Sequence, residues 1–168
     1  MRPAPSEAAP YYFNYIDRVE SDDVVQVLTT QLDEAVAFLG SVSEEKSLHR
    51  YAPDKWSLRQ LLNHINDTER LFVFRALWFA RGFEEPLPSF DQNVAVSGSG
   101  ADAVSWSDLV KEFRSIRQST IAFFQSLPDG AWDKAGIASD NRFTVRALAY
   151  IAAGHVTHHI DVISAHYL

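Results

Sequence analysis

Apolar residues recur at helical spacing in four stretches of the chain, so that each stretch presents one apolar stripe. The stretches span about 22–42, 57–81, 106–127 and 144–167. They predict four long helices that bury their stripes in one shared core. The stripe of the first stretch consists of Val24, Val27, Leu28, Leu32, Ala35, Phe38 and Leu39.

Residues that start and end helices flank these stretches. Ser57, Ser105 and Thr144 are good N-caps, because a hydroxyl oxygen can accept a free backbone N–H of the first turn. Gly82 and Pro128 follow the second and third stretches, where residues that end helices are common. The four predicted helices therefore have defined limits.

The remaining segments show no convincing β-hairpin or βαβ pattern. Residues 1–20 are predicted to form an irregular arm that packs on the body through its aromatic residues. Residues 83–105 form a long link, and long links allow consecutive helices to lie parallel. We therefore predict an all-α fold in one domain, 1–168, that is a four-helix bundle with a long connection between its second and third helices.

Composition narrows the classes of function. Hydrophobic residues make up 46% of 168 residues, enough for a real core, and the absence of cysteine excludes disulfides, iron–sulfur sites and a cysteine nucleophile. A net charge of −7 argues against nucleic acid as a partner. With no signal-peptide pattern and no apolar run of membrane-spanning length, the default expectation is a cytoplasmic protein without a membrane partner.

Three histidines carry the clearest chemical signal. His155 and His159 are four residues apart in the fourth predicted helix and share its core-facing stripe. His64 lies about 10 Å into the second helix, and the pair lies about 12–18 Å from the end of the fourth, so antiparallel helices would bring all three to a similar depth. Three imidazoles at one place can hold a metal ion and leave a position open. His158 points about 100° away from His159 and is predicted to lie at the rim.

Other interpretations of the histidines and of nearby polar residues stay open. The three could be core histidines with ordinary hydrogen-bond partners. Asp67 could orient a ligand or be a solvated carboxylate, and Asp91 in the link could lie at the rim of a site. Arg117, on an otherwise apolar stripe like Gln31, could bind an anionic substrate or pair with a carboxylate.

Two motifs resemble the DinB/YfiT-like superfamily. The first is Lys55-Trp56-Ser57 followed by His64, and the second is Gly154-His155 followed by His158-His159. The segment 87–93 is also similar to that family's link between its second and third helices. The likeness extends from about Tyr11 to Leu168.

The resemblance implies a four-helix bundle whose second and third helices are parallel. It also implies a divalent metal ion, nickel or zinc, held by His64, His155 and His159. Some relatives are S-transferases or isomerases that use a low-molecular-weight thiol. One departure concerns Asp161-Val162, because many relatives have Gly-Gln after the last histidine.

The prediction for function is a metal-dependent enzyme with a mononuclear three-histidine site. The thiol-dependent S-transferase, the isomerase and the hydrolase are all compatible with it, and the substrate would be a small molecule. The alternative is a non-catalytic bundle for protein association, in which the metal is structural or absent. A homodimer is left open in either case.

Overall fold

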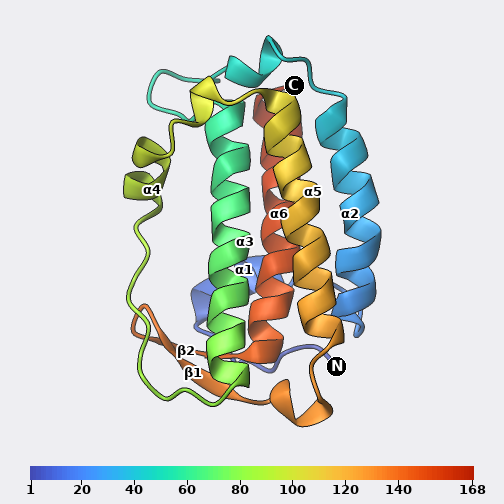
Figure 1. Cartoon of the computed structure of the whole chain (residues 1–168), viewed down its shortest axis with the longest axis vertical. Helices are drawn as coiled ribbons and strands as arrows, with labels where there is room; N and C mark the ends of the chain where they lie inside the picture. The colour runs from blue at the N-terminus through green and yellow to red at the C-terminus, as the bar shows by residue number, and fades with distance from the viewer.

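The computed structural model describes residues 1–168 and contains four long helices (Figure 1). Their limits agree with the predicted ones to within two residues, because Asp23, Ser57, Ser105 and Thr144 each cap the first turn with a side-chain oxygen. Ser57 and Gln60 form a complete capping box. The long helices are α2 (Val24–Gly40), α3 (Leu58–Ala80), α5 (Trp106–Gln125) and α6 (Val145–His166).

The four long helices form one bundle with an unusual order of directions. Helices α3 and α5 run the same way, whereas α2 and α6 run in the opposite direction (Figure 1). Helix α3 packs against both α5 and α6, and α2 packs against α5 and α6 from the other side. The expectation of parallel second and third helices is confirmed, and α3 and α6 are antiparallel neighbours.

The long link makes the parallel arrangement possible by returning the chain along the whole length of α3 (Figure 1). It contains a short helix that sequence patterns did not predict, α4 (Gln92–Gly98), and a 3-10 turn, η3 (Ala101–Ala103). Two further 3-10 turns, η2 (Lys46–Leu48) and η4 (Asp129–Ala131), lie in the other connections. The link thereby covers one side of α3 and borders the space between α3 and α6.

The prediction of a fold without any sheet was wrong in one place. Strands β1 (Ala135–Ala138) and β2 (Asn141–Thr144) form an antiparallel hairpin before α6. Its two turn residues, Ser139 and Asp140, have φ values of 49° and 59°, which a tight two-residue turn requires. The strands are short and the turn lacks glycine, so the usual hairpin signal is absent from the sequence.

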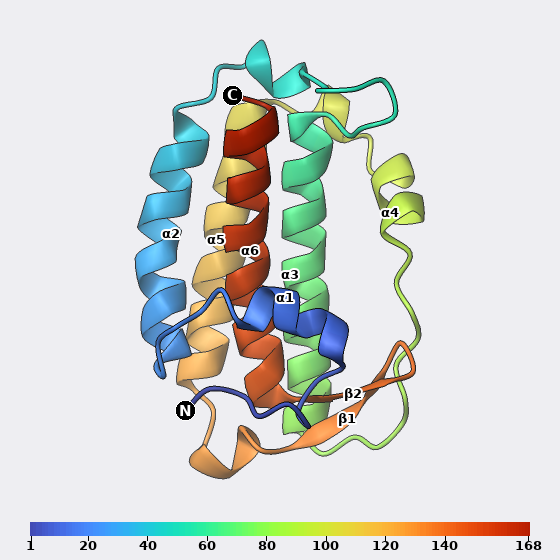
Figure 2. The same ribbon diagram turned by 180° about the vertical axis from the view of Figure 1, so that it is seen from behind.

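The N-terminal arm packs on the body as predicted, although it is more regular than predicted. It forms a 3-10 turn, η1 (Pro10–Tyr12), and a short helix, α1 (Phe13–Ile16), that lies across α6 (Figure 2). Gly154 permits this close approach, because a Cβ atom at that position would lie 2.0 Å from the carbonyl oxygen of Tyr15. The glycine that precedes His155 thus fixes where the arm crosses the bundle.

None of the helices is both long enough and apolar enough to cross a membrane.

Candidate metal centre

The three predicted histidines meet in the middle of the bundle. His64 comes from α3, and His155 and His159 come from successive turns of α6. The Nε2 atom of His155 lies 3.2 Å from Nε2 of His64 and 3.0 Å from Nε2 of His159. All three side chains are nearly buried, with at most 9% of any residue exposed. The antiparallel packing of α3 on α6 therefore brings three nitrogen atoms to one point.

Burial keeps these imidazoles neutral. It lowers the pKa of His64 to about 4 and that of His159 to about 3. Burial also holds the pKa of His155 well below its usual range, and the neighbouring His159 and His64 add to the effect. Neutral imidazole has a free lone pair, which is the form that binds a metal ion.

The hydrogen bonds of Thr68 indicate which ring nitrogen of His155 carries the proton. The Thr68 hydroxyl donates to the carbonyl oxygen of His64 at 2.7 Å, one turn earlier in α3. Its oxygen can then accept the Nδ1–H of His155, at 3.4 Å. With its proton on Nδ1, His155 presents the lone pair of Nε2 to the other two histidines, as a metal ligand does.

The donor set fits a divalent transition-metal ion. Nitrogen ligands at about 2.0–2.1 Å from one ion lie about 2.8–3.0 Å apart at octahedral angles and about 3.3–3.4 Å apart at tetrahedral angles. The Nε2 separations of 3.0 and 3.2 Å fall within this span. Hydrogen bonds among the rings cannot satisfy this cluster fully, because the single lone pair on Nε2 of His155 faces both neighbouring Nε2 atoms and no carboxylate lies among them. A cation of the zinc or nickel type would satisfy all three lone pairs.

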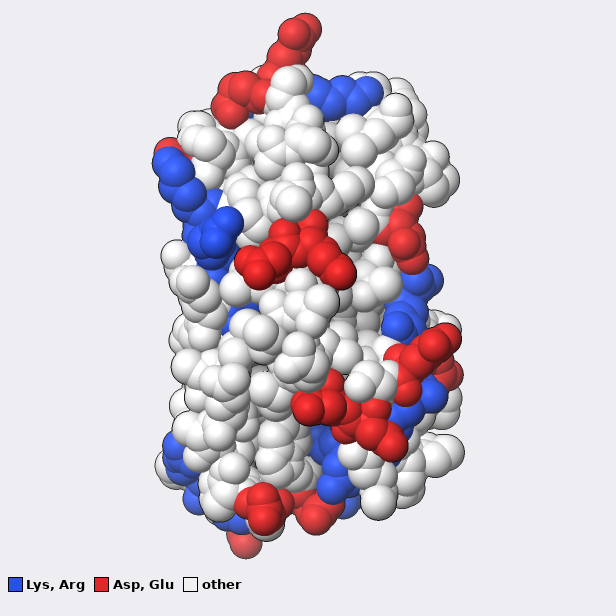
Figure 3. All heavy atoms as spheres, turned by 90° about the vertical axis from the view of Figure 1, so that its right-hand side faces the viewer, with Lys and Arg blue, Asp and Glu red and all other residues white.

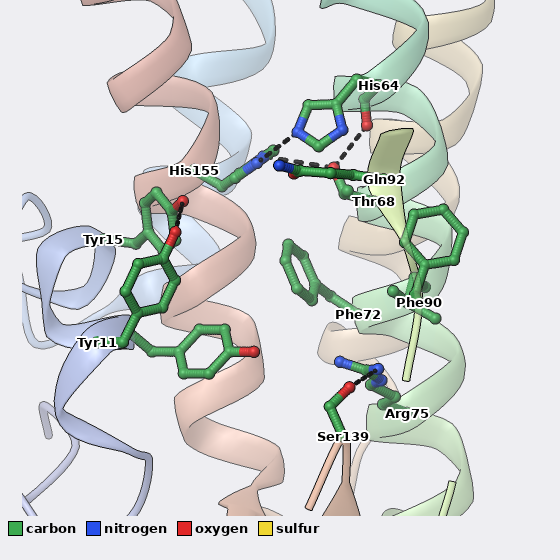
Figure 4. Close-up of a pocket in the computed structure, with 12 residues that line it drawn as sticks. Tyr11, Tyr15, His64, Thr68, Phe72, Arg75, Phe90, Gln92, Ser139 and His155 are labelled. Carbon is green, nitrogen blue, oxygen red and sulfur yellow. Dashed lines mark hydrogen bonds between the residues drawn. The ribbon is translucent and has the colours of Figure 1, made fainter. Parts of the chain in front are cut away.

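A cavity of about 120 Å³ adjoins the histidines. Figure 4 shows His64 and His155 at one end of it and Arg75 with Ser139 at the other, with Phe72 between them. The ring of Tyr15 packs edge-on against His155, and its hydroxyl lies 3.2 Å from that of Tyr11. The cavity is thus bounded by the arm, α3, α6, the link and the hairpin turn, and it has room for a small molecule beside the histidines.

Other polar residues from the sequence analysis contribute no atom to the cluster of three histidines. His158 is half-buried and packs against Tyr15. Asp67 accepts hydrogen bonds from Asn63 and Arg70 on the outside of α3. Asp91 is the N-cap of α4. The rim position predicted for His158 agrees with this placement, whereas Asp67 orients none of the three histidines.

Arg117 belongs to a buried polar network. Its guanidinium donates to both carboxylate oxygens of Glu69, at 2.8 Å each, and to the side-chain oxygen of Gln31 at 2.5 Å. Gln31 in turn donates to the carbonyl of Ala153 and to the hydroxyl of Thr157. Pairing with a carboxylate, one of the two interpretations of Arg117, is therefore correct, and the network ties all four long helices together beside the site.

Several cavity residues were missed by sequence reasoning. Thr68 and Arg75 lie four and eleven residues after His64, so helical periodicity alone places them on the same face of α3. No such signal exists for the residues from the arm, the link and the hairpin, whose positions depend on tertiary packing. The latter are Tyr11, Tyr12, Tyr15, Phe90, Gln92 and Ser139.

Two solved structures share this fold. The first is YfiT from Bacillus subtilis, titled a probable metal-dependent hydrolase with an unusual four-helix bundle topology. It has 16% sequence identity and a TM-score of 0.70, over 98% of this chain and 90% of that one. The second is a mycothiol-dependent maleylpyruvate isomerase, with 10% identity and a TM-score of 0.71 over 87% of this chain. This chain spans only 61% of the isomerase's length, and at such identities the likeness shows the fold alone.

A search of curated proteins finds no match. The sequence model of the DinB superfamily, in contrast, matches residues 28–163. This range includes the whole of α3 and α5 and all three clustered histidines. The topology of the bundle agrees with that match through the likeness to YfiT. The chain therefore belongs to the DinB superfamily.

Proposed function

We propose that this protein is a metal-dependent enzyme that acts on a small molecule in the cavity beside the three histidines. His64, His155 and His159 hold one divalent cation, zinc or nickel, through their Nε2 atoms. Such a cation supplies a Lewis acid that lowers the pKa of a water or thiol bound to it. The observation that carries the proposal is the convergence of three buried, neutral imidazole nitrogens at the end of a cavity.

The surrounding residues have separate tasks in this proposal. Thr68 holds His155 in the tautomer that exposes Nε2. Tyr15 and Phe72 pack their rings against His155 and limit the access of bulk water. A low dielectric around the cation strengthens its effect on a bound nucleophile.

Group transfer to or from a thiol, isomerisation through a thiol and hydrolysis are the reactions that this arrangement supports. All three need an activated nucleophile, and none needs a redox-active side chain. The two proteins of the same fold, a probable metal-dependent hydrolase and a mycothiol-dependent isomerase, support the same group of reactions. A low-molecular-weight thiol is therefore the first substrate class to test.

The test is metal analysis of protein produced without an affinity tag. We expect about one zinc or nickel per chain, and a loss of most bound metal in His64→Ala. The matched control is His49→Ala, because His49 is exposed and should not affect metal content. Wild-type protein that binds zinc and nickel no better than His64→Ala would contradict the proposal.

A second candidate function is protein association, with a metal that is structural or absent. Exposed apolar side chains favour it, since Phe74 and Leu77 on α3 and Val94 on α4 are 47%, 38% and 70% exposed. Phe74 borders grooves toward both α4 and α5. This candidate can be tested as association between copies of this chain, with light scattering of the wild type and of Phe74→Ser. It requires a wild-type dimer that the substitution weakens.

A further inference from the structure

Arg75 is a buried cation without a counterion. Only 3% of the residue is exposed, yet no carboxylate forms an ion pair with it. One Nη donates to the hydroxyl of Ser139 at 2.8 Å and to the carbonyl of Pro88 at 3.3 Å, and Nε is buried with no partner at all. The nearby Tyr12 phenol supplies no charge, because burial raises its pKa further above neutrality.

The other two buried arginines of this chain each have a carboxylate partner. Arg117 is matched by Glu69, and Arg59 is matched by Glu44. An unpaired buried charge is costly, and it persists where a ligand or a function compensates for it. The exception made for Arg75 therefore indicates that the negative charge it faces comes from outside the chain.

The position of Arg75 shows where such a ligand would lie. Arg75 follows His64 by eleven residues and Thr68 by seven, so all three lie on one face of α3. The guanidinium and the imidazoles of His64 and His155 line the same cavity, with Phe72 between them (Figure 4). A molecule that reaches both ends would place an anionic group at Arg75 and a second group at the histidines.

We propose that Arg75 binds the carboxylate of an elongated substrate whose reacting end lies at the three histidines. The position of the reacting end at the histidines rests on the proposed function, whereas the binding of a carboxylate by Arg75 does not. Arginine suits this role because its planar guanidinium stays charged and matches a carboxylate in shape. Ser139 and the Pro88 carbonyl act as positioning groups that hold the guanidinium toward the cavity.

The probes are ω-mercaptocarboxylates of three to eight carbons and the ω-mercaptoalcohols of equal length. Each is titrated at pH 7.5 into protein loaded with Co²⁺, whose visible spectrum reports thiol binding at the histidines. At the best-fitting length the acid should bind about tenfold to a hundredfold tighter than the alcohol, as expected for hydrogen bonds to a charged group. Arg75→Gln should abolish this preference while cobalt content and alcohol binding stay unchanged.

Two further variants keep the test decisive. Arg70→Gln removes a positive charge from the exposed side of the same helix and should retain the full preference. Arg75→Lys keeps the positive charge and should retain part of the preference for the acid. This variant replaces Arg75→Gln in the test if Arg75→Gln does not fold. Acids that bind no tighter than alcohols at any length, or a preference that survives in Arg75→Gln, would overturn the proposal.

Failure of the metal site gives a different result. If the protein takes up no cobalt, the proposed function fails, and hexanoate and hexanol are then titrated by calorimetry into the metal-free protein. Tighter binding of hexanoate that disappears in Arg75→Gln supports the anion site without the metal. Equal binding of the two counts against Arg75 itself.

Discussion

His158 and His159 are neighbours in sequence with different surroundings. His159 directs Nε2 toward His155 at 3.0 Å, whereas His158 is half-buried and packs on Tyr15. We therefore expect His159→Ala to lower zinc affinity by more than tenfold and His158→Ala to change it little, since only the former removes a proposed ligand. Competition titration with a zinc chelator measures both. Equal losses, or the reverse order, would assign the ligand to His158.

Thr68 offers a second test at the scale of one residue. Thr68→Val keeps the shape of the side chain and removes the acceptor of the His155 Nδ1–H, so metal affinity should fall by about tenfold to a hundredfold. Thr68→Ser should retain most of the affinity. Thr29→Val is the matched control, because the exposed Thr29 also bonds a backbone carbonyl one turn earlier, far from the site. A Thr68→Val protein with wild-type affinity would remove Thr68 from the site.

At the scale of single residues, the sequence predicts which side chains share one face of a helix, because helical periodicity controls this. The meeting of His64 with His155 followed from spacing and depth along two antiparallel helices. Arg75 shared that face, but which arginine lacks a carboxylate is decided by neighbours from other elements. Tyr15 reached the site through backbone contact with Gly154, which no local pattern reveals.

At the scale of elements, caps and apolar stripes were sufficient for the four long helices. They failed for the hairpin at 135–144, because it depends on packing rather than propensity. Gly136 lets β1 lie on the ring of Phe79, where a Cβ atom would come within 2.2 Å of two ring carbons. Short strands supported by such contacts carry weak local signals.

The network of Glu69 and Arg117 links these elements and can be tested by unfolding the metal-free protein in urea. Glu69→Ala leaves a buried guanidinium without its carboxylate, so the free energy of unfolding should fall by about 3–5 kcal/mol. Replacing the pair together, Glu69→Leu with Arg117→Met, should cost less than Glu69→Ala alone. Glu112→Ala, which breaks a more exposed pair with Arg70, should cost at most about 1 kcal/mol. A Glu69→Ala loss as small as that of Glu112→Ala would show that the network adds little.

For the whole molecule, the three buried histidines predict how stability depends on pH. Their folded-state pKa values are depressed, so between about pH 6.5 and pH 4 the unfolded chain binds more protons than the folded one. The free energy of unfolding of the metal-free protein should therefore fall as pH decreases through this window. Each unit of pKa depression is worth about 1.4 kcal/mol.

Urea unfolding at intervals between pH 7 and pH 5 measures this slope. His155→Gln should reduce the slope because it removes one of the three groups, whereas His49→Gln, which changes an exposed histidine, should not. Stability that stays constant over this range would show that the three imidazoles are not held neutral by the fold.

The charge of the whole molecule predicts negligible affinity for duplex DNA at physiological salt. The net charge is −7, and on the face in Figure 3 acidic and basic side chains are interspersed without a continuous basic stripe. Phosphate binding depends on clustered cations. Fluorescence anisotropy with labelled duplex checks this, and submicromolar binding that weakens with salt would contradict it.

The histidines on α3 and α6 join positions that are 91 residues apart in the chain. A cation held between them would act as a reversible cross-link, and a cross-link that closes a loop of this length reduces the entropy of the unfolded chain by the equivalent of about 4–5 kcal/mol. Because α6 comes after the five other helices in the chain, all three histidines are present only after the rest of the bundle has been synthesised. Metal uptake would then stabilise the completed bundle, and chelation would lower its free energy of unfolding.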